Sequence, residues 1–271
     1  MNLAGNKKST LHYEERGAGV PLLLIHGFPF SGQMWAAQMA GLAGGARVLV
    51  PDLPGFGKSP AIRASSTVDR YAEDCFGVLD ALDITEPAVI GGLSLGGYVA
   101  LAAARLFPLR VRGLILASTR AGADSAEGKA NRDKTIAQVK ANGPSVVTES
   151  MYPKFLSPAN YEEQPRVAGQ VRDIMRGATP EGVIAALGAM RDRPDSSGLL
   201  PNLHMPMLII HGKDDQLIPP SEAEAMAQAI PHNDLRLLAK AGHLPNLEQP
   251  EEFNRIVKEF LSLLPTPGTT V

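Results

Sequence analysis

Short apolar segments recur along this 271-residue chain, and helical patterns separate most of them. Most are apolar at consecutive positions rather than at alternate ones, as in strands that are covered on both faces. The segments are 11–15, 21–26, 47–52, 87–92, 111–118, 206–212 and 234–239. Alternation of such strands with helices is typical of a parallel sheet between two helical layers. We therefore predict an α/β fold with a mostly parallel twisted sheet flanked by helices, whose first short strand is a candidate for the antiparallel direction.

The interval 119–202 interrupts this alternation. It holds no strand-like run, only amphipathic pieces separated by Gly and Pro. Residues 167–175 place their apolar side chains on one helical face, and Thr179 followed by Pro180 is a typical helix start. We predict a helical cap over residues 119–202, inserted between strands of a core that comprises residues 1–118 and 203–271.

Size and charge restrict the classes of function. A chain of this length buries about three quarters of its unfolded surface, so it needs no disulfide, and its single cysteine, Cys75, cannot form one within the chain. The net charge is −2 and no run of five like charges occurs, which argues against nucleic-acid and anionic-membrane partners. The first ten residues lack an apolar signal region, and no run of 18 apolar residues occurs. We expect a cytoplasmic protein with a small-molecule partner, and leave association into a homo-oligomer open.

The stretch Gly92-Leu93-Ser94-Leu95-Gly96 matches the pattern G-x-S-x-G between a predicted strand and a predicted helix. Glycine fits a corner this tight because side chains there would collide with neighbouring backbone. The corner would present Ser94 at the carboxyl end of the sheet, where open α/β folds bind ligands. A closely packed glycine turn without function is the alternative, and partner residues decide between the two. A serine hydroxyl needs a general base, itself oriented by a carboxylate.

His243 is the candidate base, since it lies in a Gly-containing loop after the last predicted strand and ahead of a helix that begins near Pro250. The remaining histidines fit surface or structural positions: His12, His26, His204, His211 and His232.

Asp214 and Asp215 are the candidate acids, in the loop that follows the strand 206–212. Aspartate is also common in solvated turns. The chain order of Ser94, an aspartate and His243 favours the catalytic interpretation, because it is the order of nucleophile, acid and base in one large class of hydrolases.

Five stretches resemble the α/β-hydrolase family, in the family's order and over nearly the whole chain: LLLIHGFP, DLPGFGKS, GLSLGGYVAL, LIIHGKDDQLIPP and AGHLPNLEQPEEF. The resemblance implies the α/β-hydrolase fold, with a helical cap inserted between strands. In that family the catalytic acid usually stands four residues before a proline in the loop. Here that proline is Pro219, so the resemblance assigns the role of the acid to Asp215. Asp214 would be its solvent-facing neighbour.

By the same resemblance, the stretch HGFP is similar to an oxyanion loop. It assigns the oxyanion hole to the backbone N–H groups of Phe28 and Leu95. His26 would hold this loop, and Asp52 and Ser59 would have a structural role in a turn. No cofactor is required, and no metal is expected, since the H-x-H-x-D-H string of binuclear lactonases does not occur.

The stretches GFPFSGQMW and STRAGADSAEGKANRD resemble 3-oxoadipate enol-lactonase-like hydrolases and small-molecule esterases more loosely. They imply a lactone or a short to medium acyl ester as substrate, cleaved through an acyl-enzyme, and N-acyl homoserine lactones are a candidate. Arg120, Arg132 and Lys134 could clamp a substrate carboxylate, although charges on helix surfaces are usually only solvated.

The cap would cover the substrate pocket. Candidate pocket residues are Trp35, Met151, Met175 and Met190, for which packing is the alternative. Several alternative functions use the same fold: a cofactor-free haloperoxidase or perhydrolase, a carbon-carbon bond hydrolase, and a non-catalytic ligand-binding protein. Relatives with an aspartate nucleophile are disfavoured by Ser94.

Overall fold

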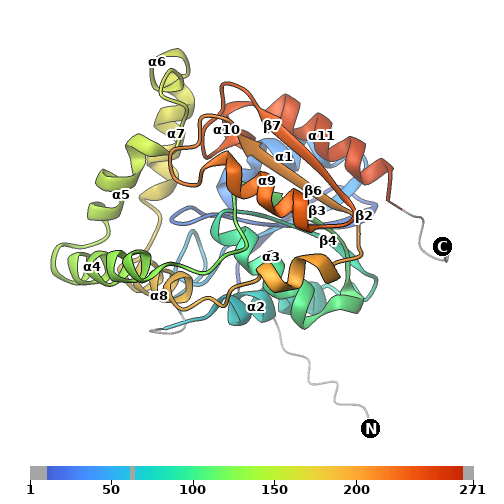
Figure 1. The fold of residues 1–271 in the computed structure, drawn as a ribbon, viewed down its shortest axis with the longest axis horizontal. Coiled ribbons are helices and arrows are strands. Elements are labelled where there is room, and N and C mark those ends of the chain that lie inside the picture. Colours follow the sequence, from blue (N-terminus) through green and yellow to red (C-terminus); the bar gives the residue numbers. More distant parts are fainter. Residues whose placement is uncertain (1–10, 62–64, 265–271) are drawn as a thin grey trace, which may run out of the picture.

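The computed structural model describes residues 11–61 and 65–264, and seven strands of this part form one sheet (Figure 1). The predicted core ranges 1–118 and 203–271 also include residues 1–10, 62–64 and 265–271, which lie outside the described residues. The strand order is β1-β3-β2-β4-β5-β6-β7, and all neighbours are parallel except β1 and β3. The strands are β1 (Tyr13–Arg16), β2 (Val20–Ile25), β3 (Ala46–Pro51), β4 (Ala88–Leu93), β5 (Val111–Ala117), β6 (Met207–Gly212) and β7 (Asn233–Leu238). The predicted α/β fold is confirmed, with β1 as the antiparallel strand.

Helices cover both faces of the sheet, and this explains the consecutive apolar residues of its strands. Along β2, Leu23 and Ile25 belong to one buried cluster, whereas Leu22 and Leu24 belong to a second cluster. Successive side chains of a strand point to opposite faces. The first cluster includes residues of α2 (Val68–Ala81), α3 (Leu95–Leu106) and α9 (Pro220–Ala229), and the second includes residues of α1 (Ala36–Leu42) and α11 (Pro250–Ser262).

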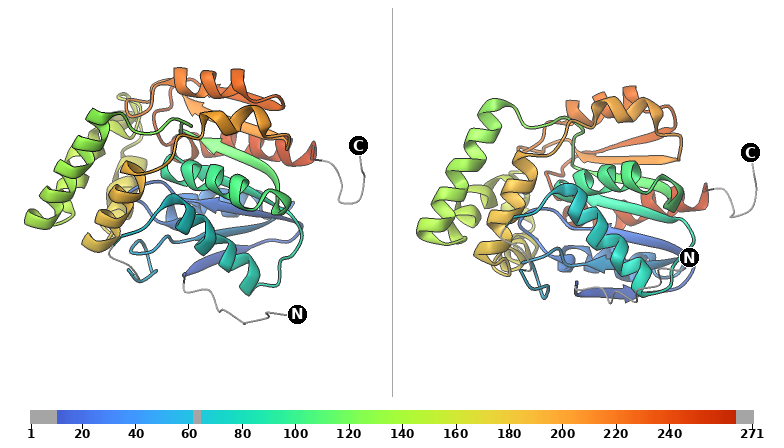
Figure 2. Two further views of the ribbon diagram at one scale, coloured as in Figure 1. Left: turned by 60° about the horizontal axis from the view of Figure 1, so that its bottom comes forward. Right: turned by 90° about the horizontal axis from the view of Figure 1, so that it is seen from below.

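The segment 119–202 contains no strand and forms a group of helices at one end of the sheet (Figures 1 and 2). Its helices are α4 (Ala126–Asn142), α5 (Ser145–Met151), α6 (Asn160–Glu163), α7 (Pro165–Met175) and α8 (Pro180–Arg191), with short 3-10 turns η3 (Tyr152–Lys154) and η4 (Ser197–Asn202). Outside the segment lie the turns η1 (Gly32–Trp35) and η2 (Pro108–Arg110) and the short helix α10 (Pro245–Glu248).

The start of α8 joins this helical segment to the loop that follows β3. The Thr179 hydroxyl caps α8 by accepting from the Gly182 N–H, and the Thr179 N–H donates to the Gly55 carbonyl at 2.9 Å. The two backbones are so close that a Cβ on Gly55 would lie 2.4 Å from the Gly182 Cα. Because Gly55 lies beyond the carboxyl end of β3, the helical segment covers that edge of the sheet. No helix in the described ranges is long and apolar enough to cross a membrane.

Candidate active site

Ser94 occupies a strained corner between β4 and α3. Its φ of 55° and ψ of −112° lie in a region that non-glycine residues rarely adopt, at a cost of about 1 to 3 kcal/mol. A Cβ on Gly92 would lie 2.0 Å from the Gly96 carbonyl oxygen, and one on Gly96 would lie 2.2 Å from the Ile25 carbonyl oxygen. Glycine is therefore required at both positions. Ser94 itself is only partly buried, unlike the residues on either side of it.

His243 and Asp215 form a buried pair at the same edge of the sheet. Asp215 follows β6 and His243 follows β7, and both side chains are almost fully enclosed. The His243 Nδ1 lies 2.7 Å from the Asp215 Oδ2, a short charge-assisted hydrogen bond in which Nδ1 is the donor. With its proton on Nδ1, a neutral His243 ring has Nε2 free to accept one.

Asp215 is held by groups on both of its oxygens. Its Oδ1 accepts from the backbone N–H groups of Leu217 at 2.8 Å and Ile218 at 3.0 Å. Its Oδ2 accepts the hydrogen bond from His243 Nδ1 and also lies 3.1 Å from the Nε2 of His211. Burial alone would raise the pKa of Asp215, but His243, His211 and the Ile218 N–H together hold that pKa well below its usual range. The carboxylate is thus ionised in the folded protein at neutral pH.

Asp214 contacts a different part of the molecule. Its side chain is exposed, and its Oδ2 accepts from the Ser157 hydroxyl at 2.8 Å. Ser157 belongs to the segment between η3 and α6. The structure therefore pairs Asp215 with His243, and connects Asp214 to the helical segment 119–202.

Glu248 is a buried carboxylate beside His243 that the sequence analysis missed. It is 4% exposed, and its Oε1 accepts from the backbone N–H groups of Gly242 at 2.8 Å and Leu244 at 3.3 Å. These two residues flank His243. Burial raises the pKa of Glu248, although its N–H donors oppose the shift. The available signal was a single acidic residue in the stretch LPNLEQP that follows the candidate base.

The same carboxylate reaches across to the helical segment. Its Oε2 accepts from the Ser157 N–H at 2.8 Å and from the Asn160 side-chain amide at 2.6 Å. The His243 N–H donates to the Phe155 carbonyl at 2.8 Å. The loop that carries His243 is therefore hydrogen-bonded to residues 155–160 at several points.

The loop after β2 packs directly against the Ser94 corner. A Cβ on Gly27 would lie 3.5 Å from the Ser94 Cβ. Phe28 and Leu95 are both buried, and neither backbone N–H donates to an acceptor within residues 11–61 and 65–264. Unpaired N–H groups beside a nucleophile can stabilise a developing oxyanion.

His26 joins the loops that follow β2 and β3. Its Nε2 accepts from the Leu53 N–H at 2.9 Å, and its Nδ1 lies 2.9 Å from the Gly27 carbonyl, so the proton is on Nδ1. Burial lowers the pKa of His26. Asp52 caps the neighbouring turn by accepting from the Gly32 and Lys58 N–H groups.

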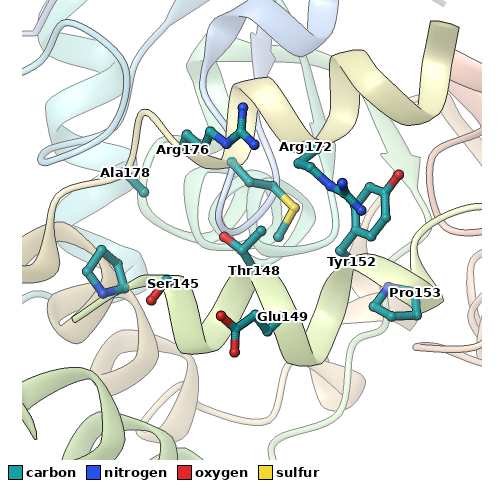
Figure 3. A pocket seen from close by; sticks show the side chains of 10 residues that line it. Ser145, Thr148, Glu149, Tyr152, Pro153, Arg172, Arg176 and Ala178 are labelled. Atoms are coloured by element: carbon teal, nitrogen blue, oxygen red, sulfur yellow. The ribbon is translucent and has the colours of Figure 1, made fainter. Parts of the chain in front are cut away.

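Among the candidate pocket residues, Met175 lines a cavity, but the lining of that cavity does not include Ser94, Asp215 or His243. This cavity of about 500 Å³ lies between α5 and α7 (Figure 3), and the guanidinium of Arg172 stacks on the Tyr152 ring along its wall. Met175 is also buried in the hydrophobic cluster that contains Trp35, Met190 is buried in the other cluster, and Met151 is partly buried against both. The ring of Trp35 packs on Phe253.

Two residues of the candidate carboxylate clamp, Arg120 and Arg132, instead pair with a carboxylate of the chain itself, together with Arg193. Arg120, Arg132 and Arg193 contact the buried Asp124 at 2.7, 3.1 and 2.7 Å. Lys134 is exposed. In the described part of the chain, no group of three or more His, Cys, Asp or Glu side chains could hold a metal ion.

Comparisons with known proteins are consistent with this geometry. A family model described as the alpha/beta hydrolase fold matches residues 20–250. A solved thermophilic esterase from Thermogutta terrifontis is 43% identical, with a TM-score of 0.92 and 94% of each chain covered. The enol-lactonase from Burkholderia xenovorans is 28% identical, with a TM-score of 0.86 over 93% of this chain and 96% of that one. A 2-hydroxymuconate semialdehyde hydrolase from Pseudomonas putida is 31% identical over 96% of this chain and 92% of its own.

Proposed function

The chain belongs to the alpha/beta hydrolase family, and on that premise we propose that it is a serine carboxylic-ester hydrolase that cleaves a lactone or a short to medium acyl ester. The observation that carries the proposal is the buried His243–Asp215 hydrogen bond at the sheet edge where the strained corner presents Ser94. Likeness to an esterase and to an enol-lactonase supports it.

The proposed reaction has two halves. Ser94 attacks the carbonyl carbon while His243 Nε2 takes the hydroxyl proton, and the tetrahedral intermediate then expels the alcohol, which receives that proton. Water repeats the attack on the acyl-enzyme and releases the acid. Asp215 keeps the His243 ring in the productive tautomer, and the N–H groups of Phe28 and Leu95 stabilise the oxyanion in both halves.

The test is steady-state hydrolysis of p-nitrophenyl acetate and butyrate by the wild type, Ser94→Ala and Ser262→Ala. Ser262 lies at the end of α11 and is exposed, so its variant controls for the loss of a hydroxyl. We expect Ser94→Ala to lower kcat by about 10⁴-fold or more, and Ser262→Ala to leave it unchanged. Multiple turnover that survives Ser94→Ala would refute the proposal, and a single burst without steady state would favour a ligand-binding protein.

The lactone part of the proposal needs its own comparison. Lactones, with N-acyl homoserine lactones among them, are assayed by pH-stat against linear esters of the same acyl length, with Ser94→Ala as the blank. We expect a higher kcat/KM for the lactones. Equal or slower lactone opening would remove the lactone from the proposal and leave the linear ester.

Carbon-carbon bond hydrolysis is a second candidate, favoured by the 31% identity to a 2-hydroxymuconate semialdehyde hydrolase. The same three side chains would serve it. Cleavage of 2-hydroxymuconate semialdehyde is followed by the loss of its dienoate absorbance. A higher kcat/KM for this cleavage than for the hydrolysis of any ester would make it the main activity.

A further inference from the structure

His211 lies in direct contact with the candidate acid. It is a residue of β6 and is 0% exposed. Its Nε2 lies 3.1 Å from the Asp215 Oδ2 and 2.9 Å from the Ile218 carbonyl oxygen. Both neighbours are acceptors, so Nε2 carries a proton and shares it between them.

The other ring nitrogen of His211 makes no hydrogen bond to the part of the chain that the structure describes. Its Nδ1 is buried without a hydrogen bond within residues 11–61 and 65–264, and the same holds for the hydroxyl of Ser118. Ser118 follows β5 next to His211, because Ala117 pairs with Ile210 in the parallel register. On the other side, His211 pairs with Leu237 of β7. Asp215 is thus the one ionisable side chain with a described contact to the ring, and His243 shares it.

We propose that His211 is a positioning residue: its Nε2–H donates to the Asp215 oxygen that also receives His243, and thereby limits how strongly that oxygen holds a protonated His243. The inference rests on the proposed function of His243 as a general base and deepens it. In the second part of each half-reaction, the base must release its proton to the leaving group. If the protonated His243 were held too strongly, this release would be slower, so a limit on its stabilisation favours turnover.

The direction of the effect follows from the hydrogen bonds. An oxygen that accepts two donors has less negative charge available for each of them. Without His211, Oδ2 would serve His243 alone, and the imidazolium would be more stable. The carboxylate would stay in place, since the Leu217 and Ile218 N–H groups still hold Oδ1.

Three substitutions separate this role from simple packing. His211→Leu removes the donor, His211→Gln places an amide N–H near the former Nε2, and His211→Asn reaches only to the position of Nδ1. We expect His211→Leu and His211→Asn to move the midpoint of the acid limb of the kcat/KM profile up by roughly 0.5 to 1 pH unit, because Asp215 Oδ2 then accepts from one donor instead of two. His211→Gln should stay near the wild type.

A second measurement does not depend on turnover. Histidine-selective NMR on Ser94→Ala, with and without His211→Leu, reports the pH at which the His243 ring takes up a proton. An upward shift of this midpoint supports the proposal even if esters prove to be the wrong substrates. An unchanged midpoint, or equal behaviour of the Gln and Asn variants, would overturn it and leave His211 a packing residue.

Discussion

The Glu248 carboxylate accepts hydrogen bonds from the backbone N–H groups on both sides of His243, through Gly242 and Leu244. Its second oxygen binds Ser157 and Asn160 of the helical segment 119–202. One buried side chain thus fixes the loop of the candidate base and connects it to that helical segment.

Glu248→Ala should therefore lower both activity and stability. It leaves up to four buried donors without an acceptor, and each unsatisfied group costs about 1 to 3 kcal/mol. We expect the Tm to fall by several degrees and kcat to fall by at least tenfold, with a smaller change in KM, because the position of His243 affects the chemical step. Circular-dichroism melts and steady-state kinetics measure both. Glu251→Ala, at an exposed position of α11, is the control. If the Glu248→Ala variant folds and keeps the wild-type kcat, the position of His243 does not depend on this contact.

The two neighbouring aspartates should respond differently to amide substitution. Asp215→Asn replaces the acceptor for His243 Nδ1, and loss of the correct tautomer costs about 10⁴-fold in kcat in serine proteases. Asp214→Asn changes only the contact with Ser157, so kcat should stay within a few-fold of the wild type. Parallel measurement of kcat on one ester compares the two. A larger loss at position 214 would reverse the assignment of the acid.

Asp215 should also contribute to the pH dependence of stability. Its pKa in the folded protein is lower than the ordinary value of about 3.8, so the folded state binds this proton more weakly than the unfolded state. The resulting stabilisation is complete above the unfolded pKa and is lost as the pH falls toward the folded pKa. Between pH 4 and pH 3, the free energy of unfolding of the wild type should fall more steeply than that of Asp215→Asn, by up to about 1.4 kcal/mol per pH unit. Parallel slopes in urea titrations would contradict the lowered pKa.

The sequence predicted the sheet, the insertion and the Ser94 corner because each depends on neighbours along the chain. Strand patterns and the glycines of the corner are local signals. Glu248 escaped notice because two of its partners are brought near only by the fold: Ser157 lies 91 positions from Glu248. His211 was given only a surface or structural position, since its place at the end of a strand does not show that its ring contacts Asp215. Trp35 was a candidate pocket residue because an apolar side chain in a motif does not reveal whether it faces a cavity or the core. The catalytic roles of the candidate residues stay predictions until the variants are measured.

Gly96→Ala should destabilise the protein far more than alanine at an open helical glycine. The added Cβ would lie 2.2 Å from the Ile25 carbonyl oxygen, so either the start of α3 or the end of β2 must move. Gly188 in α8 is the matched control, since a Cβ there meets nothing within 4 Å and alanine favours a helix by about 1 kcal/mol. We expect the Tm to fall for Gly96→Ala and to rise slightly for Gly188→Ala. Movement at the corner would also displace the Leu95 N–H, so any Gly96→Ala protein that folds should lose kcat, whereas Gly188→Ala should keep it. Equal Tm values for the two variants would mean that the corner tolerates a side chain and that the close approach of α3 to β2 is not what selects glycine.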